Sequence, residues 1–207
     1  METSAHHRSK AKFLDAALQV IRAKGYTATR IEDVCEAAGL TKGSFFHHFE
    51  SKEELAVAAA EHFARMADRL FAAAPYQRQT DPLDKVLGYV DFRRSLLQGA
   101  LPDFTCLLGT MVQEVYETNP PIRAACERHI VAHAGAVEAM LRDAKTKHAP
   151  KARWDPQGLA LFTQAVIQGA FVLAKAKGGP EVAAGSLAHL RSYLETLFIR
   201  KRKEPRS

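Results

Sequence analysis

Cysteine and histidine side chains have the most evident chemistry in this sequence of 207 residues. Cys126, His129 and His133 follow one another at i, i+3 and i+7, so a helix would carry them on one face, and a histidine pair four residues apart can chelate zinc. A fourth ligand is not identifiable, and histidines in such positions are more often hydrogen-bonded inside a helical bundle or line a pocket. The sequence therefore predicts no metal site and no cofactor.

Cys106 is a candidate reactive thiol. It lies in the first turn of a predicted helix, where the helix dipole can lower the pKa of a thiol and increase its thiolate fraction. The alternative is that Cys106 is a small apolar core residue, which is the commoner role of a free cysteine. Together with Cys35 and Cys126 it makes an odd number of cysteines without a close pair, so neither a disulfide framework nor a C-x-x-C metal site is indicated.

Catalytic and nucleotide-binding patterns are not recognisable. Residues 42–44 read Lys-Gly-Ser, whereas a phosphate-binding loop has Gly-Lys-Ser and an upstream glycine at a fixed spacing. No nucleophile and base stand in a recognisable arrangement. We therefore expect a protein that is not an enzyme, and an enzyme built on an α-helical bundle is the alternative of that class.

The elements that position these residues are expected to be helices. Apolar residues recur at spacings of three and four, and alternating β-branched residues are almost absent, which predicts an all-α protein. The predicted caps of the first four helices are Gly25 and Gly39 at C-termini, Thr29 with Glu32 and Ser51 with Glu54 as capping boxes, and Thr41 as an N-cap.

The remainder of the chain repeats one pattern, a polar cap followed by proline in the first helical turn. Asp81, Asn119 and Asp155 begin helices in this way, and Asp103 begins one without proline. The expected helices lie near 83–98, 104–117, 121–147, 157–177 and 181–200, which makes nine in all.

Residues 29–52 carry the strongest functional signal. They contain a short helix, a Gly-Leu turn and a second short helix, which is the layout of a helix-turn-helix. On a helical wheel of the second helix, Phe45 and Phe49 fall on one side, and Gly43, Ser44 and His47 fall on the other. A reader of the DNA major groove needs such an apolar back, short side chains at base edges and a glycine where the backbone approaches DNA.

The stretch 9–56 resembles the N-terminal DNA-binding domain of the tetracycline-repressor (TetR) family, and TKGSFFHHFESKEEL is similar to its most diagnostic segment. This resemblance implies a nine-helix homodimer in which three N-terminal helices bind operator DNA and a larger C-terminal domain binds an inducer. The implied domains are a helix-turn-helix domain over 1–52 with a connecting helix over 52–74, a ligand-binding and dimerisation domain over 75–200, and a basic flexible tail over 201–207.

The resemblance also implies a set of DNA-binding residues by matching position. Thr41, Lys42, Gly43 and Ser44 would lie at the groove, Phe46, His47 and His48 would border it, and Arg30 and Lys52 would hold phosphates. Where the family often has tyrosine this chain has Phe46 and His47, so a phenol–phosphate hydrogen bond is not available there. Thr41 and Lys52 also fit the simpler roles of a helix cap and a solvated surface charge.

The second domain contains candidates for an inducer site. FTCLLGTMVQEV and GAFVLAKA are similar to the electrophile-sensing N-ethylmaleimide-reductase repressor branch of the family, which responds through a cysteine at the place of Cys106, and the same alignment puts Lys175 near Cys106. An aromatic and methionine lining would suit an apolar or aromatic small molecule. The candidate ligand-binding residues are Phe92, Cys106, Met111, His129, His133, Phe162 and Lys175.

The last two predicted helices carry long apolar stripes, which favour a homodimer formed through them, although packing within one chain is the alternative. We therefore expect a ligand-responsive transcriptional repressor, released from a palindromic double-stranded DNA operator by a small apolar, aromatic or electrophilic inducer. A DNA-binding protein that no small molecule releases is the alternative function.

The formal net charge of +6 says little about DNA by itself. Residues 1–52 contain eight Lys and Arg against six Asp and Glu, whereas residues 200–207 contain five against one, so much of the surplus lies in the tail. No stretch approaches the roughly 20 uncharged apolar residues of a membrane span, and the N-terminus lacks a signal-peptide pattern. A cytoplasmic protein without a membrane partner is the expectation.

Overall fold

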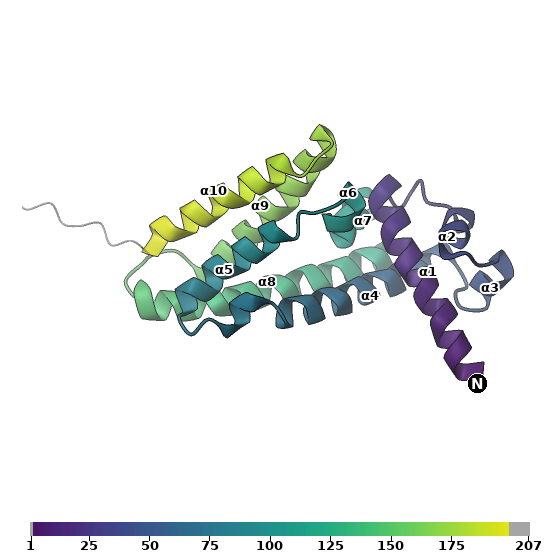
Figure 1. Cartoon of the computed structure of the whole chain (residues 1–207), viewed down its shortest axis with the longest axis horizontal. Helices are drawn as coiled ribbons and strands as arrows, with labels where there is room; N and C mark the ends of the chain where they lie inside the picture. The colour runs from purple at the N-terminus through teal and green to yellow at the C-terminus, as the bar shows by residue number, and fades with distance from the viewer. Residues whose placement is uncertain (1, 199–207) are drawn as a thin grey trace, which may run out of the picture. The chain divides into compact units, whose positions relative to one another are not determined.

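The computed structural model describes residues 2–198, with side chains from residue 6 onward. Over this range it confirms an all-α fold, with ten α-helices, one 3-10 helix and no strand (Figure 1). The helices are α1 (Glu2–Lys24), α2 (Ile31–Ala38), α3 (Lys42–Phe46), α4 (Lys52–Ala72), η1 (Pro75–Arg78), α5 (Pro82–Ser95), α6 (Leu101–Phe104), α7 (Leu107–Val115), α8 (Pro120–His148), α9 (Pro156–Lys177) and α10 (Glu181–Phe198). The basic tail predicted for 201–207 lies outside the described residues.

The chain packs as two compact units. The first contains residues 1–73 and 98–133, and the second contains residues 74–97 and 134–207. The long helix α8 contributes its first half to one unit and its second half to the other. Residues 98–133, which the sequence assigned to the C-terminal domain, therefore pack with the N-terminal helices, while the division into functional domains stays a prediction.

An aromatic centre holds α1, α3 and α4 of the first unit together. Phe13, Phe45 and Phe49 are almost fully buried, and the ring centroids of Phe13 and Phe45 lie 5.6 Å apart in an edge-to-face arrangement. Leu55 of α4 and Met111 of α7 belong to the same core. Phe13, Ala17 and Ile21, spaced four residues apart, form a buried face of α1.

Most of the predicted helix caps are confirmed. Gly25 and Gly39 both have positive φ, of 88° and 64°, as left-handed C-terminal residues require. The Thr41 hydroxyl accepts a hydrogen bond from the Ser44 amide (3.2 Å), and Ser51 accepts one from the Glu54 amide (3.1 Å). The other half of the predicted Ser51–Glu54 capping box does not form, because the Glu54 carboxylate accepts from the Glu50 amide (2.6 Å) instead. The proline-linked caps behave alike, since the side chains of Asp81, Asn119 and Asp155 each accept from a backbone amide in the following turn.

The predicted Thr29–Glu32 capping box is wrong. Thr29 lies one residue before the cap, and its hydroxyl donates to the Gly25 carbonyl (2.6 Å) at the end of α1. Arg30 is the N-cap of α2, and its amide donates to the Asp33 carboxylate (2.7 Å). The shift of one residue follows because Asp33, three residues after Arg30, supplies the acceptor that the predicted box assigned to Glu32.

The number of helices also differs from the predicted nine. The single helix expected near 104–117 is two helices, α6 and α7, that meet at Thr105 and Cys106. Asp103 does not begin a helix. It lies inside α6, where its carboxylate accepts from the Ala100 amide (2.8 Å), and Cys106 is the N-cap of α7. The interruption arises because Thr105 and Cys106 both have extended backbone.

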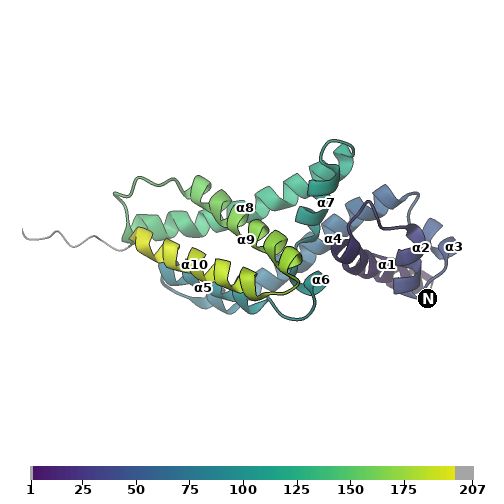
Figure 2. The same cartoon turned by 90° about the horizontal axis from the view of Figure 1, so that it is seen from above.

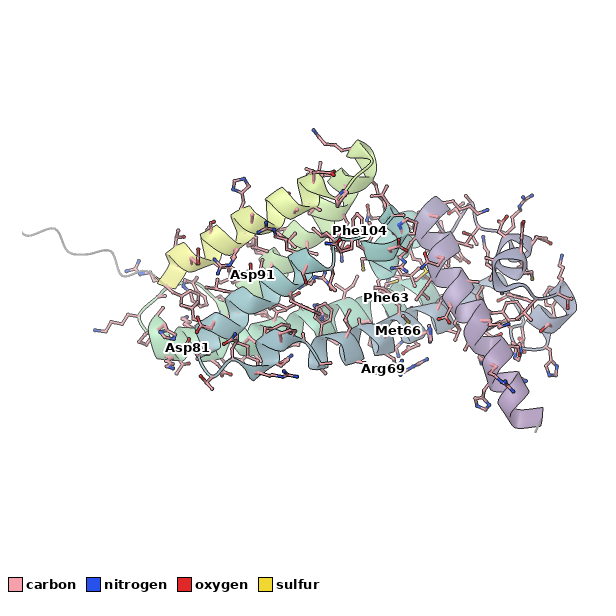
Figure 3. All side chains as sticks on the ribbon, viewed as in Figure 1. Phe63, Met66, Arg69, Asp81, Asp91 and Phe104 are labelled. Carbon is pink, nitrogen blue, oxygen red and sulfur yellow. The ribbon has the colours of Figure 1, made fainter. Side chains whose placement is uncertain are left out.

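The second unit consists of α5, the second half of α8, α9 and α10. Inside it the Gln164 amide nitrogen donates to the Tyr89 hydroxyl (3.2 Å), and both residues are buried. At the start of α5, the Asp81 carboxylate lies 2.8 Å from Lys147 Nζ and from His148 Nε2, and these bonds hold its pKa well below the usual range. Figure 3 labels Asp81 and Asp91, the latter an ion-pair partner of Arg191 (2.9 Å).

Helix α9 corrects one expectation about membranes. By length and composition alone α9 could cross a membrane, and it holds an uncharged stretch close to the length that the sequence expectation denied. This is weak evidence, because a core helix passes the same test, and 44% of the apolar window is buried within the protein. The buried side includes Leu159, Ile167 and Phe171.

Candidate nucleic-acid interface

Helix α3 has the two-sided arrangement that its sequence predicts. Phe45 and Phe49 point into the core, whereas Lys42, Gly43 and His47 are exposed and Ser44 is half-buried. Figure 2 shows α3 next to α2 in the first unit. A Cβ atom added at Gly43 would meet only the Thr41 hydroxyl oxygen, at 3.8 Å. Packing inside the protein therefore does not require glycine there, and its small size leaves room for an approaching molecule.

The exposed cation of α3 already has a partner. Lys42 Nζ donates to Glu32 Oε1 of α2 (2.6 Å), and this hydrogen bond raises the pKa of Lys42 and lowers the pKa of Glu32. Both side chains are more than half exposed. A DNA contact through Lys42, as the sequence predicts, would require it to exchange this carboxylate for a phosphate or a base edge. Arg30, the N-cap of α2, has 78% of its side chain exposed, and its guanidinium lies 3.8 Å from the Asp33 carboxylate.

The Lys52 ammonium group makes its contacts within the protein rather than pointing freely into solvent. Its Nζ donates to the carbonyls of Tyr26 (3.1 Å), Thr27 (3.4 Å) and Thr29 (2.9 Å). It also lies 4.4 Å from the centroid of the Tyr26 ring, within the range of a cation–π contact. These contacts hold the loop between α1 and α2, so the side chain predicted to hold phosphate has a structural role in this conformation.

His48 is the other predicted DNA contact whose side chain packs inside the protein. It is only 9% exposed, and its Nε2 lies 2.6 Å from the Ser9 hydroxyl of α1. Burial, and then the nearby His6, His47 and Lys10, lower the pKa of His48. Its side chain connects the segment after α3 to α1, while the neighbouring Phe46 (50% exposed) remains outside.

Two side-chain contacts that the sequence did not predict connect the helix-turn-helix region to other helices of the first unit. The Glu114 carboxylate of α7 accepts from the amides of Tyr26 (3.1 Å) and Thr27 (2.8 Å) in the loop between α1 and α2. Gly25 is favoured by its positive φ of 88°, and a Cβ atom there would displace the Glu114 carboxylate from its present position. Residues nearly ninety positions apart carry no periodic signal that would have predicted this pair.

Arg22 makes the second connection. Its buried guanidinium donates to the carbonyls of Asp103 and Thr105, each at 3.4 Å, and lies 5.8 Å from the ring of Phe63 on α4, which Figure 3 labels. Burial lowers the pKa of Arg22, whereas the neighbouring Asp103 and Cys106 raise it. The segment that carries Cys106 therefore packs on α1 in the first unit.

The candidate ligand-binding residues are divided between the two units. Cys106, Met111, His129 and His133 belong to the first, and Phe92, Phe162 and Lys175 belong to the second. Met111 is fully buried core, whereas Phe162 is 44% exposed on the outside of α9. The predicted proximity of Lys175 to Cys106 remains a prediction.

The helix face of Cys126, His129 and His133, which could in principle chelate zinc, makes other contacts. His129 Nε2 lies 3.0 Å from Glu61 Oε2, the His133 ring stacks at 4.8 Å on Phe71, and Cys126 is fully buried. Burial raises the pKa of the Cys126 thiol to about 12, which disfavours the thiolate that binds metal. Among the residues that the structure describes, no three His, Cys, Asp or Glu side chains are grouped to hold an ion.

A short exposed helix on an aromatic core, preceded by a helix and a glycine turn, defines a helix-turn-helix DNA-binding protein. The family profile for bacterial regulatory proteins of the tetR family matches residues 13–59, and the profile for the tetracyclin repressor-like C-terminal domain matches residues 82–190. The chain belongs to the tetR family and is a ligand-responsive DNA-binding transcriptional regulator. Regulators of this family bind operator DNA as dimers and respond to small molecules.

Known transcriptional regulators are similar in sequence to this chain over most of its length. It is 27% identical to the transcriptional regulator AcuR of Cereibacter sphaeroides over 87% of this chain and 81% of AcuR. It is 24% identical to the transcriptional repressor NemR of Escherichia coli K12 over 95% of this chain and 98% of NemR. The crystal structure of a TetR regulator from Chloroflexus aurantiacus superposes with a TM-score of 0.81 at 25% identity, covering 93% of this chain and 96% of that one.

Proposed function

We propose that this protein is a repressor that binds a palindromic operator as a homodimer, with α3 of each protomer in the major groove. The observation that carries the proposal is the exposed face of Lys42, Gly43, Ser44 and His47, held by the buried Phe45 and Phe49. A two-fold dimer presents two such helices to paired half-sites about 34–36 Å apart or at a multiple of that distance. No catalytic step is required, and the protein acts in the cytoplasm, where its DNA is.

The roles of the interface residues follow from their exposure. Thr41, Lys42, Gly43 and Ser44 lie at the base edges, while Phe46 and His47 border the groove and Arg30 binds phosphate. His48 and Lys52 keep their predicted place at the edge of the interface but act by positioning. Their contacts with Ser9 and with the carbonyls after α1 fix the angle at which α3 meets DNA.

The homodimer is proposed to form through α9 and α10. The outer side of α9 exposes Leu161 (50%), Phe162 (44%), Val172 (47%) and Leu173 (48%), and Tyr193 of α10 (46%) stacks edge-on against Phe162. Gly169, exposed between them, has no neighbour within 4 Å of an added Cβ and would let a second helix approach closely. An exposed apolar stripe of this length marks an interface, and a second copy is the occupant that two-fold recognition requires.

The inducer is proposed to be an apolar, aromatic or electrophilic small molecule, and Cys106 is its candidate electrophile target. Cys106 is half-buried at the N-cap of α7, whereas Cys35 and Cys126 are buried. Burial raises the pKa of both Cys35 and Cys126, which leaves Cys106 as the thiol that reacts first. An adduct on Cys106 would disturb the Arg22 contacts to Thr105 and thereby shift α1.

Replacing Lys42 and His47 with alanine together is expected to lower operator affinity by roughly 100-fold or more, because two side chains at the groove are removed. Electrophoretic mobility shift against an operator selected from random duplexes measures the loss, and sedimentation should show an intact dimer. A double variant that still selects the operator would exclude α3 as the reading helix.

The Glu32→Gln variant is expected to change operator affinity in the opposite direction. It removes the carboxylate that pairs with Lys42, so binding should tighten by a few-fold at low salt and by less at high salt. Weaker binding in this variant would show that the ion pair orients Lys42 rather than competing with DNA.

Replacing Cys106 with serine is expected to abolish release of operator DNA by N-ethylmaleimide, since the hydroxyl does not react with this electrophile. Fluorescence anisotropy of a labelled operator measures release. Cys126→Ala is the matched control and should respond like the parent protein, because Cys126 is fully buried. Equal release from the Cys106→Ser variant would eliminate the thiol mechanism, and the absence of release by any small molecule or thiol reagent would favour the non-inducible alternative.

A further inference from the structure

Three histidine rings from two separate segments meet beside α3. The ring centroid of His6 on α1 lies 4.3 Å from that of His48 and 5.2 Å from that of His47, and the last two are 5.5 Å apart. His6 and His47 are exposed, whereas His48 is buried behind them. Only His47 and His48 belong to the helix-turn-helix segment, so α1 adds His6 to the same surface.

The buried ring of His48 is held by Ser9 of α1. The Ser9 hydroxyl lies 3.0 Å from the His6 carbonyl and 2.6 Å from His48 Nε2. The other ring nitrogen, His48 Nδ1, is buried without a hydrogen-bond partner. Burial lowers the pKa of His48 and so favours its neutral form.

Among the side chains that the structure describes, the ionisable groups around the cluster are cationic or become so. His6, His7 and Lys10 face it from α1, His47 faces it from the end of α3, and the remaining neighbours are the rings of Phe13 and Phe49. Lys10 Nζ lies 5.2 Å from the Phe49 centroid. Protonating the outer imidazoles therefore creates repulsion in the free protein, which an anion in contact with them would relieve.

We propose that His6 and His47 form a phosphate-binding pair that becomes protonated when DNA binds, so that operator affinity rises as the pH falls. This inference rests on the proposed function, because it places DNA against α3. A phosphate next to an imidazole favours its charged form, and by linkage whatever binds the protonated state more tightly takes up protons. His48 stays neutral and supports the pair from behind.

The test measures the affinity of a fluorescein-labelled operator duplex, recovered by selection from a random pool, between about pH 6 and pH 8 at constant ionic strength and with a chelator present. The expected result is up to about tenfold tighter binding per pH unit for each proton taken up. His6→Gln and His47→Gln should each flatten the dependence, and the double variant should nearly abolish it. His148→Gln, which removes a half-buried histidine of α8 in the second unit, is the matched control and should keep it.

A second measurement does not depend on variants. In the NMR spectrum of the unmodified protein, the ring protons of His6 and His47 should titrate at higher pH with the duplex than without it. Affinity that does not change with pH, or a dependence that persists in the double variant, would overturn the inference. Failure to recover any duplex at any pH would instead overturn the proposed function.

Discussion

Replacing Phe45 with alanine is expected to lower the free energy of unfolding by about 3–5 kcal/mol, the usual loss for a fully buried phenylalanine, and to abolish DNA binding. Helix α3 has only five residues, so its stability comes from packing rather than from helix propensity. Phe45 is fully buried, with its ring 5.6 Å from Phe13 and 5.5 Å from Phe49. Its removal leaves a cavity directly behind the exposed face.

Urea unfolding followed by far-UV circular dichroism measures the effect, because the single tryptophan, Trp154, lies in the other unit. Phe46→Ala is the matched control, since it removes the same side chain at the next position, where half of it is exposed. Its loss of stability should be about 1 kcal/mol or less. Equal destabilisation by the two variants would contradict the assignment of Phe45 as the support of α3.

Replacing Phe162 with glutamate is expected to convert the dimer into monomers and to remove specific operator binding. The proposed interface is symmetric, so a single substitution buries two carboxylates, each with a desolvation penalty of several kcal/mol. The dimer dissociation constant should rise by roughly 10³-fold or more. Sedimentation velocity over a range of protein concentrations measures it.

Val131→Glu is the control for this substitution. Val131 is more exposed than Phe162, at 57% against 44%, but it lies in the first unit on α8. The control variant should remain dimeric. If Phe162→Glu stays dimeric while Val131→Glu dissociates, the interface does not involve the outer face of α9.

The helix-turn-helix was predictable because its signals are local. The spacing of Phe45 and Phe49, the cap at Thr41 and the turn at Gly39 fall within eleven residues, and each acts on backbone that is adjacent in sequence. These local signals gave a wrong prediction at the start of α2, where two carboxylates could each have accepted the hydrogen bond of the helix cap. The capping box at Thr29 is displaced because Asp33 captures the Arg30 amide, while the Thr29 hydroxyl bonds back to Gly25.

The sequence by itself determined the class of protein and pointed to the helix proposed to read DNA, because that information lies in one continuous segment whose apolar period faces one core. Only the tertiary structure decided which of its polar residues are available. Lys52 and His48 look like contacts in sequence but are bound to the α1–α2 loop and to Ser9. His6 and Glu114, from α1 and α7, join or support the interface instead. These pairings connect distant parts of the chain, and helical periodicity shows which side of a helix is buried but not which residue of another helix meets it.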